Sequence, residues 1–217
     1  VTGAATTASA ITLTFPAGVL KTGTPQAASV SGVTVSTTED FASAGAASVA
    51  LGGQVSVGTS LTFANAADRV GNRVTSGAVS IVFTPVTAIP VDGVITINVP
   101  SGYFATRASG AASGTTLVCA SACAGAVAST AVGVTATQIT VVVTGAATTA
   151  SAITLTFPAG ALKTGTPQAA SVSGVTVSTT QDFASAGAAS DALGGQVSVG
   201  TSLTFAKTSG NRVTSGA

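Results

Sequence analysis

The chain contains no histidine, no tryptophan and no methionine, and it has a single tyrosine. Without histidine it lacks the most common general base and the most common metal-ligating side chain. Serine is abundant, but no segment matches the nucleophile elbow Gly-x-Ser-x-Gly or a phosphate-binding glycine loop. These absences argue against an enzyme and against a bound cofactor.

Charge is also scarce, because the 217 residues include only 7 Lys or Arg and 6 Asp or Glu, for a net charge of +1. Seven scattered cations form no basic patch, so a nucleic-acid partner is not expected. A surface with so little charge is expected to be covered by sugar or to pack against other copies of the chain. No Asn-x-Ser/Thr sequon is present, so glycans would be O-linked.

Cysteine is limited to Cys119 and Cys123, which we predict to form a disulfide. A zinc half-site is an incomplete alternative without a third thiol or a histidine, and a reactive redox pair is a further one. A disulfide indicates an oxidising compartment, and therefore an extracellular or cell-surface protein. Asp40, Asp68 and Asp92 are far apart in the sequence, so a calcium site built from several carboxylates is not expected.

Long hydrophobic runs are missing too, and none reaches the roughly 18–20 residues that span a bilayer. We therefore expect no membrane span in this chain. What the chain does contain is Val, Ile and Thr, which favour strands, together with 26 Gly and 7 Pro that favour turns. This composition predicts an all-β protein.

The clearest feature present is a duplication, since residues 1–63 recur at 143–205 with three changes. Val1 aligns with Val143, so the period is 142 residues. The three differing pairs are Val19 and Ala161, Glu39 and Gln181, and Val49 and Asp191. Duplication of this kind is typical of arrays that bury one unit against the next.

A weaker repeat lies inside the period, with residues 81–83 and 94–102 aligning on 139–141 and 152–160. We therefore predict three units in the order A, B, A′. Their bounds are residues 1–78, 79–142 with the cysteine loop, and 143–217.

Alternating apolar and polar residues predict short strands separated by turns. The expected strands are 11–15, 33–36, 54–57, 60–63, 79–84, 95–99, 115–118, 138–144 and 153–157. The expected core residues are Ile11, Leu13, Phe15, Phe41 and Phe63, with their copies Ile153, Leu155, Phe157, Phe183 and Phe205. A short helix over residues 43–50 is an alternative based on alanine content. This pattern predicts tandem antiparallel β-sandwich units of the immunoglobulin-like type.

The start of the alignment suggests an incomplete unit. Val143 falls inside the expected strand 138–144, whereas its counterpart Val1 is the first residue, so unit A lacks most of that strand. Two readings remain open: a slice of a longer tandem array, or donor-strand exchange in which a strand from the next molecule fills the exposed edge. Both predict a filament.

The block Ile-Thr-Leu-Thr-Phe-Pro-Ala-Gly at 153–160, with its halved repeat, resembles the tandem immunoglobulin-like repeats of microbial extracellular fibril and adhesin proteins. The resemblance implies a structural filament subunit whose partners are other copies of itself. The alternative is an adhesin stalk or a carbohydrate-binding surface module. In that case Tyr103 and Arg107, beside the cysteine loop, are the expected ligand contacts.

Overall fold

The structure is a computed structural model that describes residues 10–198 and 200, apart from 109, 111, 122, 124 and 129–131. Regular structure in this part of the chain is almost entirely β, and the one helix there is the 3-10 turn η1, Ala66–Asp68. The expectation of an all-β chain is confirmed. None of the helical structure within the described ranges is long and apolar enough to cross a membrane.

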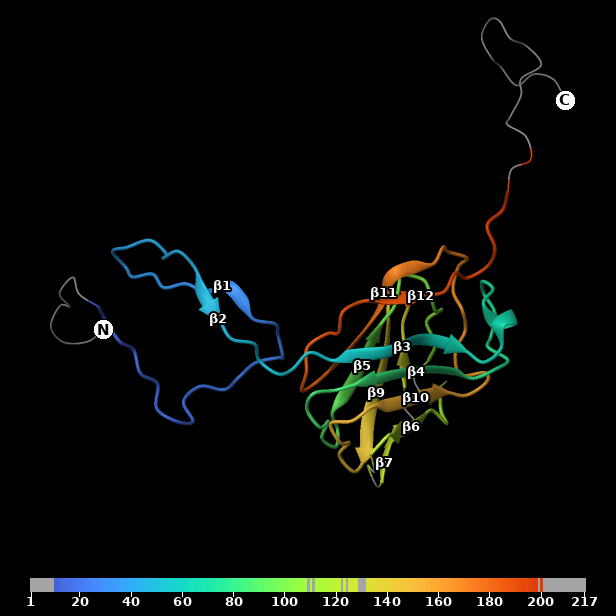
Figure 1. Ribbon diagram of the computed structural model, residues 1–217, viewed down its shortest axis with the longest axis horizontal. Coiled ribbons are helices and arrows are strands. Elements are labelled where there is room, and N and C mark those ends of the chain that lie inside the picture. Colours follow the sequence, from blue (N-terminus) through green and yellow to red (C-terminus); the bar gives the residue numbers. More distant parts are fainter. Residues whose placement is uncertain are drawn as a thin grey trace, which may run out of the picture.

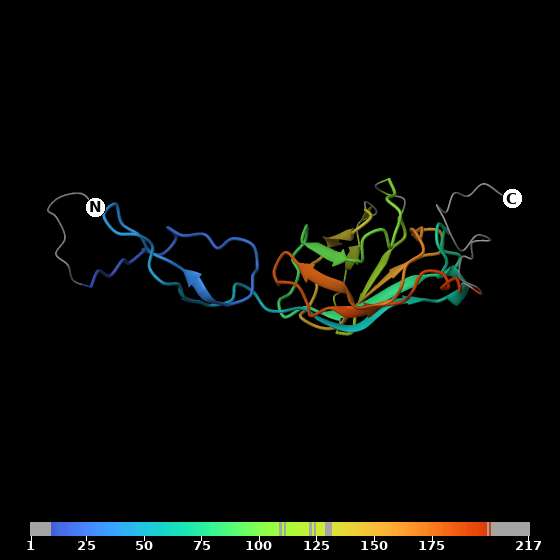
Figure 2. The same ribbon diagram turned by 90° about the horizontal axis from the view of Figure 1, so that it is seen from above.

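Two antiparallel sheets pack against each other as a sandwich (Figure 1 and Figure 2). The first sheet has the order β3-β4-β10-β6, and the second has the order β12-β11-β5-β9-β7, with β8 beside β9. The strands of the first sheet are β3 (Ser56–Phe63), β4 (Val79–Thr84), β10 (Ile153–Phe157) and β6 (Thr116–Cys119). Those of the second are β12 (Ala188–Ser190), β11 (Ser171–Thr179), β5 (Val94–Asn98), β9 (Gln138–Gly145), β7 (Ala126–Ala128) and β8 (Gly133–Val134).

The strands form where the sequence alternates, because alternate side chains of a strand point to opposite faces of the sheet. β4 buries Val79, Ile81 and Phe83 and leaves the residues between them half-buried. β9 and β10 show the same alternation. The strands expected at 79–84, 138–144 and 153–157 are therefore confirmed.

A third sheet, the two-stranded hairpin of β1 (Ser29–Val33) and β2 (Ala46–Ser48), lies in an N-terminal segment that extends away from the sandwich (Figure 1). The strand expected at 11–15 does not form, and the region of the alternative helix contains β2 instead. The prediction that Ile11, Leu13, Phe15 and Phe41 are core residues is wrong for this structure, because all four are exposed. Phe205 lies outside the described residues.

The sandwich takes strands from all three predicted units. β3 comes from residues 1–78, β4 to β8 from 79–142, and β10 to β12 from 143–217, while β9 crosses a predicted boundary. Packing therefore groups residues 53–193 across the three predicted units, because β10 lies between β4 and β6 and β11 pairs with β5. The immunoglobulin-like topology and the tandem arrangement stay predictions.

Candidate functional site

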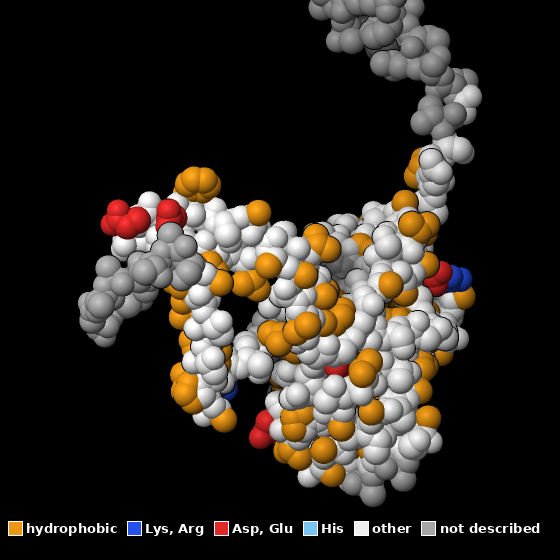
Figure 3. All heavy atoms as spheres, turned by 60° about the vertical axis from the view of Figure 1, so that its left-hand side comes forward, with side chains coloured by type: hydrophobic (Ala, Val, Ile, Leu, Met, Phe, Trp, Pro, Cys, Tyr) orange, Lys and Arg blue, Asp and Glu red, His pale blue; other side chains and the backbone are white. Residues whose placement is uncertain are grey.

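The two copies of the repeat have almost the same sequence but opposite environments. Leu13 is 70% exposed, whereas Leu155 at the matching position is fully buried, and Val33 and Val175 differ in the same way. Figure 3 shows hydrophobic side chains at the surface of the N-terminal segment. Further pairs that are exposed in the first copy and buried in the second are Ile11/Ile153, Phe15/Phe157, Val19/Ala161, Leu20/Leu162 and Val35/Val177.

Residues 152–193, here called the resident segment, complete both sheets of the sandwich. Residues 10–51, here called the exposed segment, match them position by position. β10 lies between β4 and β6 and places Leu155 opposite Ile81 on one side and Leu117 on the other. β11 extends the second sheet by pairing with β5. The resident segment therefore supplies an inner strand of one sheet and the last two strands of the other.

A buried carboxylate fastens the resident segment to the rest of the fold. Asp182 is fully buried, and it accepts hydrogen bonds from the Gly53 N–H at 2.9 Å, the Thr87 N–H at 2.8 Å and the Thr87 hydroxyl at 2.9 Å. Asp40, at the matching position of the exposed segment, is exposed. The residues that receive the resident segment lie within 53–120, and this range is called the acceptor below.

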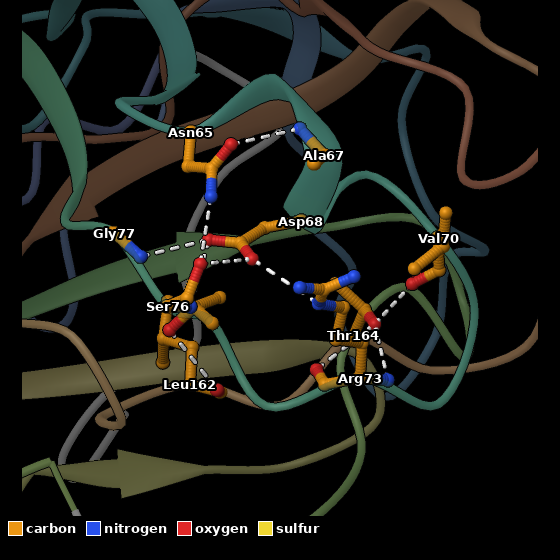
Figure 4. Close-up of polar contacts among 10 residues, drawn as sticks. Asn65, Ala67, Asp68, Val70, Arg73, Ser76, Gly77, Leu162 and Thr164 are labelled. Carbon is orange, nitrogen blue, oxygen red and sulfur yellow. Dashed lines mark hydrogen bonds and ion pairs between the residues drawn. The ribbon is translucent and has the colours of Figure 1, made fainter.

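The far end of the resident segment is held beside η1. Asp191 forms an ion pair of 2.9 Å with Arg69, whose carbonyl oxygen accepts a hydrogen bond from the Gly194 N–H at 2.8 Å. Closer to β10, the buried Thr164 hydroxyl accepts a hydrogen bond from the Arg73 N–H at 2.9 Å. Its single proton is shared between the carbonyl oxygens of Val70 and Arg73, in the loop after η1 (Figure 4). Strand pairing, a carboxylate and loop hydrogen bonds thus fix the segment along its whole length.

The hairpin within each segment is the same in both copies. In each copy two residue pairs are opposite one another, with a register shift between them: Ser29/Ser48 and Val33/Ala46 in the first, Ser171/Ser190 and Val175/Ala188 in the second. β11 is nevertheless longer than β1, and its extra residues 176–179 are those that pair with β5. The hairpin is therefore local, whereas the longer strand depends on the acceptor.

A second buried carboxylate stabilises the loop after η1. Asp68 is 1% exposed and accepts from the Ser76 N–H, the Ser76 hydroxyl and the Gly77 N–H, each at 2.8 Å (Figure 4). The Arg73 Nε lies 3.4 Å from the same carboxylate. Burial raises the pKa of Asp68, but these hydrogen bonds and the arginine outweigh burial and hold the pKa below its usual value.

The two expected ligand contacts are engaged inside the fold. Tyr103 is fully buried and packs against Phe63 and Phe104, with ring centroids 6.5 and 5.1 Å away. Burial, with the charge of Asp191 as a smaller cause, raises the pKa of Tyr103 to about 12. The Arg107 guanidinium donates a hydrogen bond to a backbone carbonyl in the turn after β10. Within the described part of the chain, these two side chains do not form an exposed platform.

Cys119 and Cys123 form the predicted disulfide. Cys119 ends β6, and the next residue, Ala120, donates its N–H to the carbonyl oxygen of Ala152 at 2.7 Å. The disulfide loop therefore lies beside the start of the resident segment, at the edge of the acceptor.

The described residues contain no group of three or more His, Cys, Asp or Glu that could hold a metal ion. An open groove of about 740 Å³ lies between residues 23–25 and the end of β11. Asp182 lines this groove, but the hydrogen bonds described above already occupy its carboxylate. The candidate functional site is therefore the apolar face that the exposed segment shares with the resident segment.

Sequence reasoning missed Asp68 and the contacts of Asp182. The sequence held one signal for the importance of Asp182. An aspartate is kept at positions 40 and 182, while its neighbour changes from Glu39 to Gln181. Asp68 lies in the part of the period that differs between the copies, so the repeat gave no signal for it.

Comparison with family models, with curated proteins and with solved structures gave no match for this chain.

Proposed function

We propose that this chain is a structural subunit of an extracellular filament or cell-surface appendage, built from β-units that follow one another head to tail. The observation that carries the proposal is the contrast between the two copies. The second copy is an integral part of a sandwich, while the first offers the same apolar face to solvent. An exposed apolar face of this extent is a typical interaction surface.

The path of the chain supports a head-to-tail arrangement. Gly53 lies beside Asp182 before β3 begins, and Gly194 lies beside Arg69, which follows η1 after β3 ends. The N-terminal segment and the end of the described chain leave the sandwich on different sides (Figure 1). Units joined in this way form a string, and the disulfide and the scarcity of charge fit an extracellular location with O-linked glycans.

The alternative function, an adhesin stalk or carbohydrate-binding module, would require an exposed aromatic or polar platform. Tyr103 is buried and Arg107 is bonded to the backbone, so these two residues do not favour it. We therefore propose the filament alone.

Electron microscopy of the native material tests the proposal. We expect filaments with continuous density between neighbouring units and one axial repeat for each 142-residue period, Val1 to Val143. Dispersed single particles in the native material would contradict the filament and favour a binding module.

A further inference from the structure

The exposed segment has two faces: one whose side chains are buried in the second copy, and one whose side chains are exposed in both copies. Val30 and Val172, at matching positions, are each 90% exposed, so this side chain faces outward even where the segment is docked. Leu13 and Leu155 differ, since the first is exposed and the second is buried between β4 and β6. The second copy thus shows which residues of the first need cover, and which strands would cover them.

The acceptor of the same molecule cannot supply that cover. If the exposed segment took the place of the resident one, Leu51 would lie where Leu193 is, next to Gly194 and Arg69. Gly52 alone separates Leu51 from Gly53, and such a link reaches about 7 Å at most. Gly53, however, lies before the first residue of β3, whereas Arg69 follows the last residue of β3, so the two positions are at opposite ends of this strand.

The distance from the docked position of Leu51, beside Arg69, to Gly53 is set by the length of β3, and it is too large for this link. β3 has 8 residues and so extends over about 26 Å, at roughly 3.3 Å per residue. Along it, Gln54 bridges to Phe183 near the start and the Ser60 hydroxyl bonds to Ala189 further on, so the resident segment runs beside β3 from one end toward the other. An exposed segment directly bonded to residue 52 therefore cannot fold back onto its own acceptor.

We infer that residues 10–51 are a strand donor for a second copy of the acceptor: a further repeat of residues 53–120 that has no resident segment of its own, since residues 152–193 already fill the acceptor of this chain. In the docked state residues 11–15 form the inner strand between the neighbour's β4 and β6, and residues 34–37 extend β1 along its β5. Asp40 accepts the hydrogen bonds of the neighbour's Gly53 and Thr87. This inference rests on the proposed head-to-tail function and names its interface: the folding unit is one 142-residue period cut at residue 52 and not at residue 1.

The three differences between the segments fit this docking with small costs. Val49 replaces Asp191, so only the half-exposed ion pair with Arg69 is lost, and such pairs contribute little. Glu39 replaces Gln181 in a turn that is half-buried in the docked copy. Val19 replaces Ala161, which is buried in the docked copy, so this substitution adds volume at a buried position of the interface.

The test is an extended chain in which a copy of residues 52–142 is fused to the N-terminus, so that a second acceptor precedes the exposed segment. Hydrogen exchange read by mass spectrometry compares this protein with the 217-residue chain. Peptides that contain residue 19, 39 or 49 differ in mass from those of the resident segment, so the two copies are read separately. We expect exchange at residues 11–20 to slow by about two orders of magnitude or more in the extended chain, to the rate at 153–162.

Two variants of the extended chain provide matched controls. Leu13→Asp should abolish the new protection of residues 10–51 and leave the resident segment protected. Val30→Asp, on the outward face, should leave both segments protected. Protection at 153–162 shows in every sample that the original sandwich is folded.

Two outcomes would overturn the inference. One is fast exchange throughout residues 10–51 of the extended chain while 153–162 remain protected. The other is full protection of residues 10–51 in the monomeric 217-residue chain, because it would mean that the segment docks within its own molecule. Both outcomes are independent of the filament, which is tested on native material.

Discussion

Asp40 and Asp182 occupy matching positions, yet one is in solvent and the other is fully buried with three hydrogen bonds. At the scale of single residues, the environment is thus set by what packs over the side chain and not by its neighbours in sequence. Asp68 shows why such an environment must supply donors. Burying a carboxylate costs free energy, and the three hydrogen bonds to Asp68 offset this cost.

Asp68→Asn should lower the free energy of unfolding at pH 7 by about 1–3 kcal/mol, because charge-assisted hydrogen bonds are replaced by weaker ones. The pKa of Asp68 in the fold lies below its usual value of 3.8. The carboxylate therefore stabilises the fold fully above that value, and this contribution is lost as the pH falls through the lowered pKa. Urea unfolding at pH 7 and near pH 2 should give a difference between the two proteins that shrinks in acid. A difference that does not change with pH would contradict the role of the charge.

At the scale of elements, local sequence determined some strands and tertiary contacts determined others. The hairpins β1/β2 and β11/β12 have the same register, so a turn and two short strands suffice to form them. The sequence Ile-Thr-Leu-Thr-Phe is a strand at 153–157 but not at 11–15, because only the second copy has β4 and β6 on either side. Alternation predicted both as strands, and no property of the five residues could have separated them.

Leu155→Ala should cost about 2–5 kcal/mol of unfolding free energy, because it leaves a cavity between the two sheets. Leu13→Ala removes the same side chain from the same local sequence, and its effect should stay within about 0.5 kcal/mol. Urea unfolding of the two variants measures this difference directly. Equal losses would contradict the assignment of Leu155 to the core and Leu13 to solvent.

At the scale of the whole molecule, the sandwich follows the 142-residue period but is cut at a different place from the sequence alignment. The repeat in the sequence identified the period, alternation predicted the strands at 79–84, 138–144 and 153–157, and the two lone cysteines predicted the disulfide. The repeat could not identify the cut, since an exact period looks the same from any starting residue. The cut is determined by contacts far apart in the sequence, such as Gly53 with Asp182 and Ile81 with Leu155.

The different packing of the two copies is tested most simply by limited digestion of the native chain with trypsin, because Lys21 and Lys163 lie in the same sequence, Leu-Lys-Thr-Gly. Lys21 is exposed, whereas Lys163 is half-buried and its backbone forms an antiparallel β-bridge with Val74. Cleavage requires an accessible backbone, so we expect rapid cleavage after Lys21 and survival of the bond after Lys163. Cleavage after both lysines at the same rate would contradict the claim that the two copies differ in packing.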